Sequence, residues 1–219
     1  MQKNFGNAKD QLETGADAGQ GAGPDAGLYQ SRFEHDACGF GMFVQLDDQP
    51  QRRLVDAALE ALNRLTHRGA IAPDGLTGDG CGILLRKPKA YLRALASESA
   101  IALAEIFASG LVFVDPNNPE PALATLKACL HSEGLHAVDF RVVPTDHSAI
   151  GAQAKLSVPE VRQVYVSAPA SMLEERFERA LFIARRKAEL ALSVDAYFYV
   201  VSLSQHSFGY KGMVMPAAL

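Results

Sequence analysis

Residues 197–204 predict a strand that is apolar on both of its faces. Tyr, Phe, Val and Leu side chains fill odd and even positions alike, whereas a half-exposed strand alternates apolar and polar side chains. Such a strand needs cover on both sides, which a sheet with one face in water does not give. The chain is therefore expected to fold into stacked layers that enclose this segment.

Segments with helical and with strand periodicity intermix along the rest of the chain. Helices are expected from Pro50 to residues 67–69, over residues 91–108 and 120–133, and from Ser171 to Leu192; strands are expected over residues 40–46, 83–86, 111–114, 137–143 and 161–166. Intermixed helices and strands pack most economically as a layered α/β sandwich.

Residues 1–34 differ from this pattern because they are rich in Gly, Ala, Asp and Gln. They cannot bury enough apolar area to offset the entropy cost of ordering the backbone, which predicts a disordered or loosely attached segment. An ordinary flexible tail and a removable leader both fit this composition.

Overall composition excludes several classes of protein. A net charge of -4 gives no electrostatic reason to expect nucleic acid or an anionic membrane as partner. The cysteines are odd in number and widely separated, which argues against a disulfide scaffold and fits a reducing compartment. The histidines have no metal-ligand spacing, no apolar run is long enough for a membrane span, and residues 1–10 lack a secretion-signal pattern. A cytoplasmic protein without a metal site is predicted.

Cys38 lies where the leader gives way to the apolar run of residues 40–46. Removal of the leader would make it an N-terminal cysteine, which carries a nucleophile and a base on one residue. The α-amine titrates near about 8 and the thiol near about 8.5, so the amine can accept the thiol proton around neutral pH. The alternative is a small buried apolar residue, as most free cysteines are, and spacing alone favours that alternative.

Arg68 closes the first predicted helix beside a glycine-rich loop, residues 73–82. Its guanidinium could hold a substrate carboxylate or could be a surface cation favoured by the helix dipole, and spacing favours the latter. Residues 77–82, TGDGCG, look superficially like a phosphate loop, but they lack its lysine and precede a strand. Cys81 could lie near a site or fill core space, and Cys129 is expected in the core.

Three segments carry a family-like pattern: HDACGFG at residues 35–41, LNRLTHRGA at residues 62–70 and TGDGCGIL at residues 77–84. Together they resemble the amino-terminal glutaminase domain of the glutamate synthase large subunit. The likeness runs from about residue 28 to the end of the chain and includes residues 141–146 and 210–213. With it, the nucleophile interpretation of Cys38 becomes the favoured one.

The resemblance implies a class II glutamine amidotransferase with an α+β fold, a four-layer αββα N-terminal-nucleophile hydrolase sandwich, of which this chain is expected to hold the first part only. Residues 1–37 are then a propeptide cut off at the Ala37–Cys38 bond, and residues 38–219 an incomplete amidotransferase domain. Cys38 is expected to attack the side-chain amide of L-glutamine, releasing ammonia and leaving a thioester that water hydrolyses. Arg68 matches the family's helix-end arginine and is expected to orient the substrate.

The resemblance also implies a reaction, cofactors and partners that belong to the full-length enzyme. Ammonia would pass to 2-oxoglutarate to make glutamate, with FMN and an iron–sulfur cluster held outside this domain, which itself is expected to hold no cofactor. The remainder of the large subunit and a small reductase subunit are the implied partners, and NADPH, NADH and ferredoxin all stay open as electron donors. The family's asparagine–glycine oxyanion-hole pair is not found in this chain, so a partial enzyme with little activity alone is expected.

Two alternatives to a glutamate synthase glutaminase stay open. One is the glutaminase part of another class II amidotransferase, with a phosphoribosyl or sugar-phosphate acceptor; residues 67–70 and 143–146 favour glutamate synthase over it. The other is a noncatalytic remnant of the fold, which an end of the chain at Leu219 favours and the retention of Cys38 disfavours.

Overall fold

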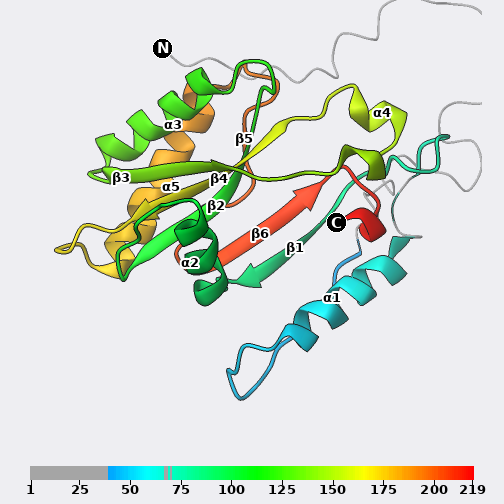
Figure 1. Ribbon diagram of the computed structural model, residues 1–219, viewed down its shortest axis with the longest axis horizontal. Coiled ribbons are helices and arrows are strands. Elements are labelled where there is room, and N and C mark those ends of the chain that lie inside the picture. Colours follow the sequence, from blue (N-terminus) through cyan, green and yellow to red (C-terminus); the bar gives the residue numbers. More distant parts are fainter. Residues whose placement is uncertain (1–38, 67–68, 70) are drawn as a thin grey trace, which may run out of the picture. The chain divides into compact units, whose positions relative to one another are not determined.

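A four-stranded antiparallel sheet lies at the centre of the computed structural model, which describes residues 39–66, 69 and 71–219 (Figure 1). Its order is β3 (Ala137–Val142), β4 (Glu160–Ser167), β2 (Phe107–Val114) and β5 (Tyr199–Val200). Strand β2 is buried along nearly its whole length, so both of its faces are covered. The sheet thus has the enclosed character that the layered prediction requires.

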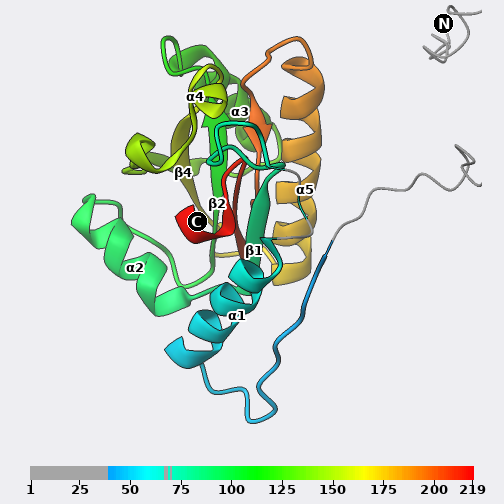
Figure 2. The same ribbon diagram turned by 90° about the vertical axis from the view of Figure 1, so that its right-hand side faces the viewer.

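Helices α3 (Glu120–Ser132) and α5 (Glu174–Ala191) cover one face of this sheet (Figure 2). Both present apolar side chains at helical spacing, and in α5 these are Phe177, Leu181, Ala184 and Ala188, all buried. They pack with alternate residues of β2 and β4 into the larger of two core clusters. The predictions of helices at 120–133 and from Ser171 are confirmed to within a few residues.

The other face of the sheet packs against a smaller core cluster. Phe107 and Tyr165 of the sheet meet Leu92 of α2 (Lys89–Glu98) and Phe208 of β6 (Ser207–Gly212) in this cluster. Strand β6 pairs antiparallel with β1 (Cys81–Arg86) as a separate two-stranded sheet. Helix α1 (Arg52–Arg64) contacts β1 and the 3-10 turn η4 (Pro216–Ala218). Short turns η3 (His147–Ala149) and α4 (Ala152–Lys155) precede β4.

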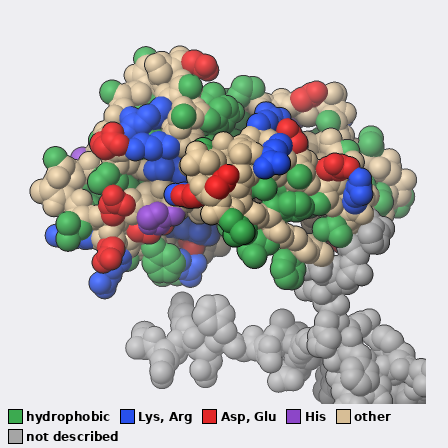
Figure 3. Space-filling model, turned by 90° about the horizontal axis from the view of Figure 1, so that it is seen from below, with side chains coloured by type: hydrophobic (Ala, Val, Ile, Leu, Met, Phe, Trp, Pro, Cys, Tyr) green, Lys and Arg blue, Asp and Glu red, His purple; other side chains and the backbone are tan. Residues whose placement is uncertain are grey.

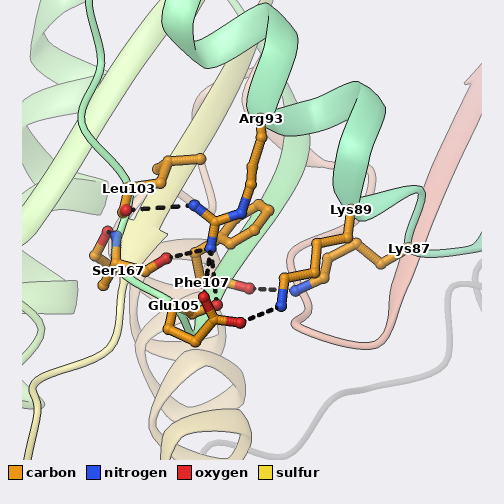
Figure 4. A network of polar contacts seen from close by, with 8 residues as sticks. Lys87, Lys89, Arg93, Leu103, Glu105, Phe107 and Ser167 are labelled. Carbon is orange, nitrogen blue, oxygen red and sulfur yellow. Dashed lines mark hydrogen bonds and ion pairs between the residues drawn. The ribbon is translucent and has the colours of Figure 1, made fainter.

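The predicted helix over residues 91–108 is wrong in its second half. Helix α2 ends at Glu98, where Ala100 adopts a positive φ of 57° and the Ile101 N–H returns to the Ala96 carbonyl at 2.8 Å. Side chains of α2, and that of Lys87 two residues before it, then hold the following segment in place (Figure 4). Arg93 donates to the carbonyls of Ala104 and Glu105 at 2.7 and 3.0 Å. In a continuing helix these carbonyls would accept backbone N–H groups four residues further on, but here they accept the Arg93 side chain instead.

Lys87 belongs to the same network. Its Nζ donates to the Phe107 carbonyl at 2.6 Å and lies 4.1 Å from the centre of the Phe107 ring. Burial, together with the neighbouring charges of Lys89 and Arg93, lowers the Lys87 pKa to about 8. Lys89 in turn pairs with Glu105 at 2.5 Å, so the start of α2 is tied to the start of β2.

Residues 197–204 form a regular strand only at Tyr199 and Val200, which corrects the longer predicted strand. The reason is a close crossing over β2: a Cβ at Gly110 would lie 1.7 Å from the Ser202 carbonyl oxygen. The segment crosses β2 at this point and then enters β6, so it links the two sheets. Val200, Ser202 and Leu203 are buried but Tyr199 is 43% exposed, so the predicted cover on both sides holds for only part of the segment.

The predicted strand over residues 40–46 is also wrong. The described part, residues 39–46, has no strand, and Phe40, Met42 and Leu46 are 94%, 83% and 97% exposed. Alternating apolar side chains make a strand only when a neighbouring backbone pairs with them, and no described strand does. Val44 and Leu46 instead line a shallow depression with Leu54 of α1.

Charged side chains of both signs are interspersed on the face drawn in Figure 3. Among the described residues some charged side chains pair within one helix, as Arg52 does with Asp56 and Arg185 with Glu189, both at 2.7 Å. No helix in the described ranges is long and apolar enough to cross a membrane.

Candidate active site

Cys38 and Arg68, the two site residues that the sequence predicts, lie outside the described residues. Their roles stay predictions. What the structure does describe is the frame on either side of Arg68: the end of α1 before it, and the loop of residues 71–80 that leads into β1 after it.

Helix α1 ends in a tight turn immediately before this position. The Leu65 N–H donates to the carbonyls of Ala61 and Leu62 at 3.2 and 3.0 Å, and the Thr66 hydroxyl donates to the Asn63 carbonyl at 2.6 Å. These bonds satisfy carbonyls that a helix end otherwise leaves unpaired. The apolar face predicted for this helix is half-buried, so α1 holds the turn against β1.

Residues 71–78 form a small hairpin after this turn. Ile71 and Gly78 bridge its ends, and the Ala72 N–H donates to the Thr77 carbonyl at 2.9 Å. Asp74 closes the tip: one carboxylate oxygen accepts the N–H groups of Leu76 and Thr77 at 3.0 and 2.8 Å, and the other accepts the Thr77 hydroxyl at 2.7 Å. Hydrogen bonds from Thr77 and Leu76 hold the Asp74 pKa well below its usual range. Asp74 is therefore a charged, fixed acceptor.

The hairpin is joined to a segment more than seventy residues away in the sequence. Asp74 accepts the Gln153 N–H and the Thr77 hydroxyl accepts the Ala154 N–H, both at 3.4 Å. Gly151 makes this approach possible, because a Cβ there would lie 2.2 Å from the Asp74 carboxylate and 2.3 Å from the Thr77 hydroxyl oxygen. The sequence analysis did not predict this contact. The only sequence features that bear on it are the turn-forming Pro73-Asp74-Gly75 run and Gly151.

Glycines in the 77–82 run serve backbone packing. A Cβ at Gly82 would lie 2.7 Å from the Tyr210 carbonyl oxygen, and one at Gly80 would lie 3.1 Å from the Gly212 carbonyl oxygen. Gly80 also has a φ of +113°, which side-chain-bearing residues rarely adopt. The close pairing of this run with β6 and the residues after it accounts for these glycines, and the run leads into a strand as predicted.

Cys81 and Cys129 are the described cysteines, and neither has the surroundings of a reactive thiolate. The Cys81 thiol donates to the Val214 carbonyl at 3.4 Å, and burial raises its pKa. Cys129 packs against the larger core, as predicted, and burial raises its pKa too. A thiol whose pKa is raised by burial is a poor nucleophile at neutral pH. In the described ranges no cluster of three or more His, Cys, Asp or Glu side chains is placed to hold a metal ion.

Comparison with known proteins identifies the family. Residues 38–219 match the family described as class-II glutamine amidotransferases. The chain belongs to this family. The match begins at Cys38, the residue for which the sequence predicts nucleophilic chemistry.

Curated relatives of this amidotransferase are glutamate synthases. The chain is 34% identical over 194 residues to the large chain of the NADPH glutamate synthase of Bacillus subtilis, and 32% identical over 203 residues to that of Azospirillum brasilense. It is 31% identical over 193 residues to the ferredoxin-dependent glutamate synthase of Pyropia yezoensis. These matches cover 87%, 89% and 85% of this chain, but only 13%, 13% and 12% of the relatives. The predicted resemblance is thus confirmed, and the chain spans about an eighth of the length of these relatives.

Proposed function

We propose that this chain is the glutaminase part of a glutamate synthase, with Cys38 as its N-terminal nucleophile. The observation that carries the proposal is that the class-II amidotransferase match begins at Cys38 and continues to Leu219. The glutamate synthase relatives, which cover most of the chain, support the assignment to that enzyme over other amidotransferases.

The full fold in this proposal is a four-layer αββα sandwich, of which the described residues are a part. Support comes from the order of contacts: α3 and α5 pack on the β3-β4-β2-β5 sheet, the smaller core joins this sheet to the β1-β6 pair, and α1 contacts β1. An amidotransferase of this kind then has its nucleophile at the start of residues 38–219, after removal of residues 1–37.

The chemistry follows from one residue with two functional groups. The α-amine of mature Cys38 accepts the thiol proton, and the sulfur forms a bond to the side-chain carbonyl carbon of L-glutamine. When the C–N bond breaks, the amine returns that proton to the leaving nitrogen, which departs as ammonia. Water then attacks the γ-glutamyl thioester, its proton passes to the sulfur, and glutamate and free thiol are released.

Arg68 orients the substrate in this proposal. A guanidinium presents two parallel N–H donors, which match the two oxygens of the glutamine α-carboxylate. The turn at the end of α1 and the hairpin of residues 71–78 support the role, because hydrogen bonds hold both of these described segments, one before and one after Arg68 in the sequence. Preorganised neighbours reduce the entropy lost when a long side chain is fixed on a substrate.

Transfer of the ammonia to 2-oxoglutarate, FMN and the iron–sulfur cluster belong to the whole synthase in this proposal. The described residues do not fit an iron–sulfur cluster, which needs several cysteine thiolates close together. Cys81 and Cys129 lie in β1 and α3 and form no such group with other described side chains. A small reductase subunit and the remainder of the large subunit are the proposed partners.

Covalent labelling tests the nucleophile. An electrophilic diazoketone analogue of glutamine should modify the mature chain once, at Cys38, and excess L-glutamine should block the reaction. Cys38→Ser should abolish the label, and Cys129→Ser is the matched control that should keep it. Label at Cys81 or Cys129 that L-glutamine blocks would contradict the assignment.

Isotope transfer tests the acceptor in the full-length enzyme. With amide-¹⁵N glutamine, 2-oxoglutarate and a reductant, the label should appear in the α-amino group of newly made glutamate. Labelled free ammonium without labelled glutamate would show that the acceptor is a different molecule, and would leave only the glutaminase assignment standing.

A further inference from the structure

Strand β1 is an edge strand of the described structure. Its antiparallel register with β6 continues at Lys87, the residue after β1, whose N–H donates to the His206 carbonyl at 2.7 Å. Hydrogen-bonded pairs alternate along an antiparallel ladder, so the backbone groups of Gly82, Leu84 and Arg86 point away from β6. Among the described residues, no backbone or side-chain group bonds to these N–H and C=O groups.

The outer edge of β1 is open to solvent. Leu84 is 71% exposed, and Gly82 and Arg86 are exposed as well, although helix α1 also contacts β1. A row of N–H and C=O groups without partners is a template on which another strand can pair. The edge therefore offers backbone hydrogen bonds together with an exposed leucine at its centre.

Other edges of the described sheets carry features that discourage strand pairing. Strand β3 has the charged Asp139 and Arg141 among its six residues, and β5 has only two residues. On the outer edge of β6, the Ser202 hydroxyl accepts the Gly209 N–H at 3.1 Å and donates to the Gly209 carbonyl at 3.4 Å. Strand β1, CGILLR, has no Lys, no Pro and no bulge, and its charged residue, Arg86, is the last. It thus lacks the usual protection of an edge strand.

We propose that β1 pairs with β1 of a second copy of this chain, antiparallel and centred on Leu84, in a two-fold dimer. In this register Leu84 faces Leu84 of the second copy, and Gly82 faces Arg86, so every outward-pointing N–H and C=O of the strand gains a partner. Ile83 faces Leu85, so apolar side chains meet apolar ones. Arg86 lies opposite a glycine, so no like charges face each other.

The pairing enlarges a sheet that is small by itself. An isolated pair of strands is marginally stable in water, whereas three or more strands with an apolar face are more stable. The dimer joins the two-stranded sheets of both copies into one sheet of order β6-β1-β1-β6. Because both copies use the same edge, the assembly closes at two copies. The dimer does not depend on Cys38 chemistry.

Light scattering after size-exclusion chromatography of the full chain tests the dimer. The parent should change from monomer to dimer as its concentration rises, with no larger species. Leu84→Lys places two like charges opposite each other at the centre and should weaken association about tenfold or more, with an unchanged far-ultraviolet circular dichroism spectrum. Leu190→Lys is the matched control and should dimerise as the parent does, because Leu190 is 72% exposed but lies on α5.

Cross-linking tests the register, in a chain that carries Cys38→Ser, Cys81→Ser and Cys129→Ser. Residues that face each other in a hydrogen-bonded pair have Cα atoms about 5.5 Å apart, which a disulfide can span. Oxidation should therefore join two copies through Leu84→Cys. It should not join them through Arg86→Cys, because the equivalent residues lie about 14 Å apart in this register.

Three results would overturn the proposal: a parent chain that stays monomeric, a Leu84→Lys variant that dimerises as the parent does, or equal cross-linking at both positions. Species larger than a dimer would overturn the two-fold closure.

Discussion

Replacing Gly110 with alanine should strongly destabilise the fold, because the crossing of residues 201–204 over β2 leaves no room for a side chain. The added Cβ would lie 1.7 Å from the Ser202 carbonyl oxygen and 2.8 Å from the Leu203 Cα. Carbon and carbonyl oxygen approach to about 3.3 Å at closest in ordinary weak contacts, so the segment must move by roughly 1.6 Å. Both groups belong to backbone, so no rotamer change relieves the overlap.

The magnitude follows from what such a shift breaks. The Val201 N–H donates to the Leu111 carbonyl at 2.9 Å, and the Ser109 N–H donates to the Ser204 carbonyl at 3.3 Å, and both bonds join the moving segment to β2. Each is worth about 1 kcal/mol, and overpacking a core adds about 1–3 kcal/mol. A loss of about 3–5 kcal/mol in the free energy of unfolding is expected, against a typical total of about 5–15 kcal/mol.

Urea unfolding followed by tyrosine fluorescence and far-ultraviolet circular dichroism measures this loss. Gly209→Ala is the matched control, since Gly209 is also buried beside Ser202 but its added Cβ would meet side-chain atoms at 3.5 Å or more. That variant should stay within about 1 kcal/mol of the parent. If Gly110→Ala also stayed within about 1 kcal/mol, the crossing of residues 201–204 over β2 would be refuted.

Three further predictions concern the site frame and its surroundings. Gly151→Ala should raise amide hydrogen exchange across the hairpin of residues 71–78, because its Cβ displaces the hairpin's carboxylate; unchanged exchange would show that the contact does not hold the loop. The pKa of Lys87 is about 8 in the folded chain, below its unfolded value of 10.5, so its charge costs folding free energy in full below pH 8. Stability to urea should therefore rise as the pH goes from 8 to 10.5, and Lys87→Met should lack this rise. An identical pH profile in Lys87→Met would contradict the prediction. Iodoacetamide at neutral pH should alkylate Cys81 and Cys129 far more slowly in the folded than in the urea-unfolded chain, and equal rates would contradict their raised pKa values.

Strong local periodicity made most of the fold predictable. Helices α3 and α5 carry apolar residues at three- and four-residue spacing, and residues 111–114 of β2 are a short apolar run, so tertiary packing agrees with local pattern there. The Ala- and Leu-rich stretch before β2 misled, because Ala100 turns the chain with a positive φ that its sequence does not suggest. Residues 40–46 have the alternating pattern of a strand but form none, because a strand also needs a neighbouring backbone to pair with.

The candidate site was predictable as a set of motifs but not as a structure. Family-like segments around Cys38 and Arg68 led to the class II amidotransferase prediction, which the family match confirms. The contact of Asp74 with the segment after Gly151 joins residues 79 positions apart, and only the tertiary fold brings them together.

The intact mass of the purified chain tests the central claim most directly, since nucleophilic chemistry by Cys38 requires it to be an N-terminal residue. The account predicts a mass that has lost residues 1–37, and retention of those residues in the Cys38→Ala variant but not in Cys129→Ala. A purified wild-type chain whose mass still includes residues 1–37 would contradict it.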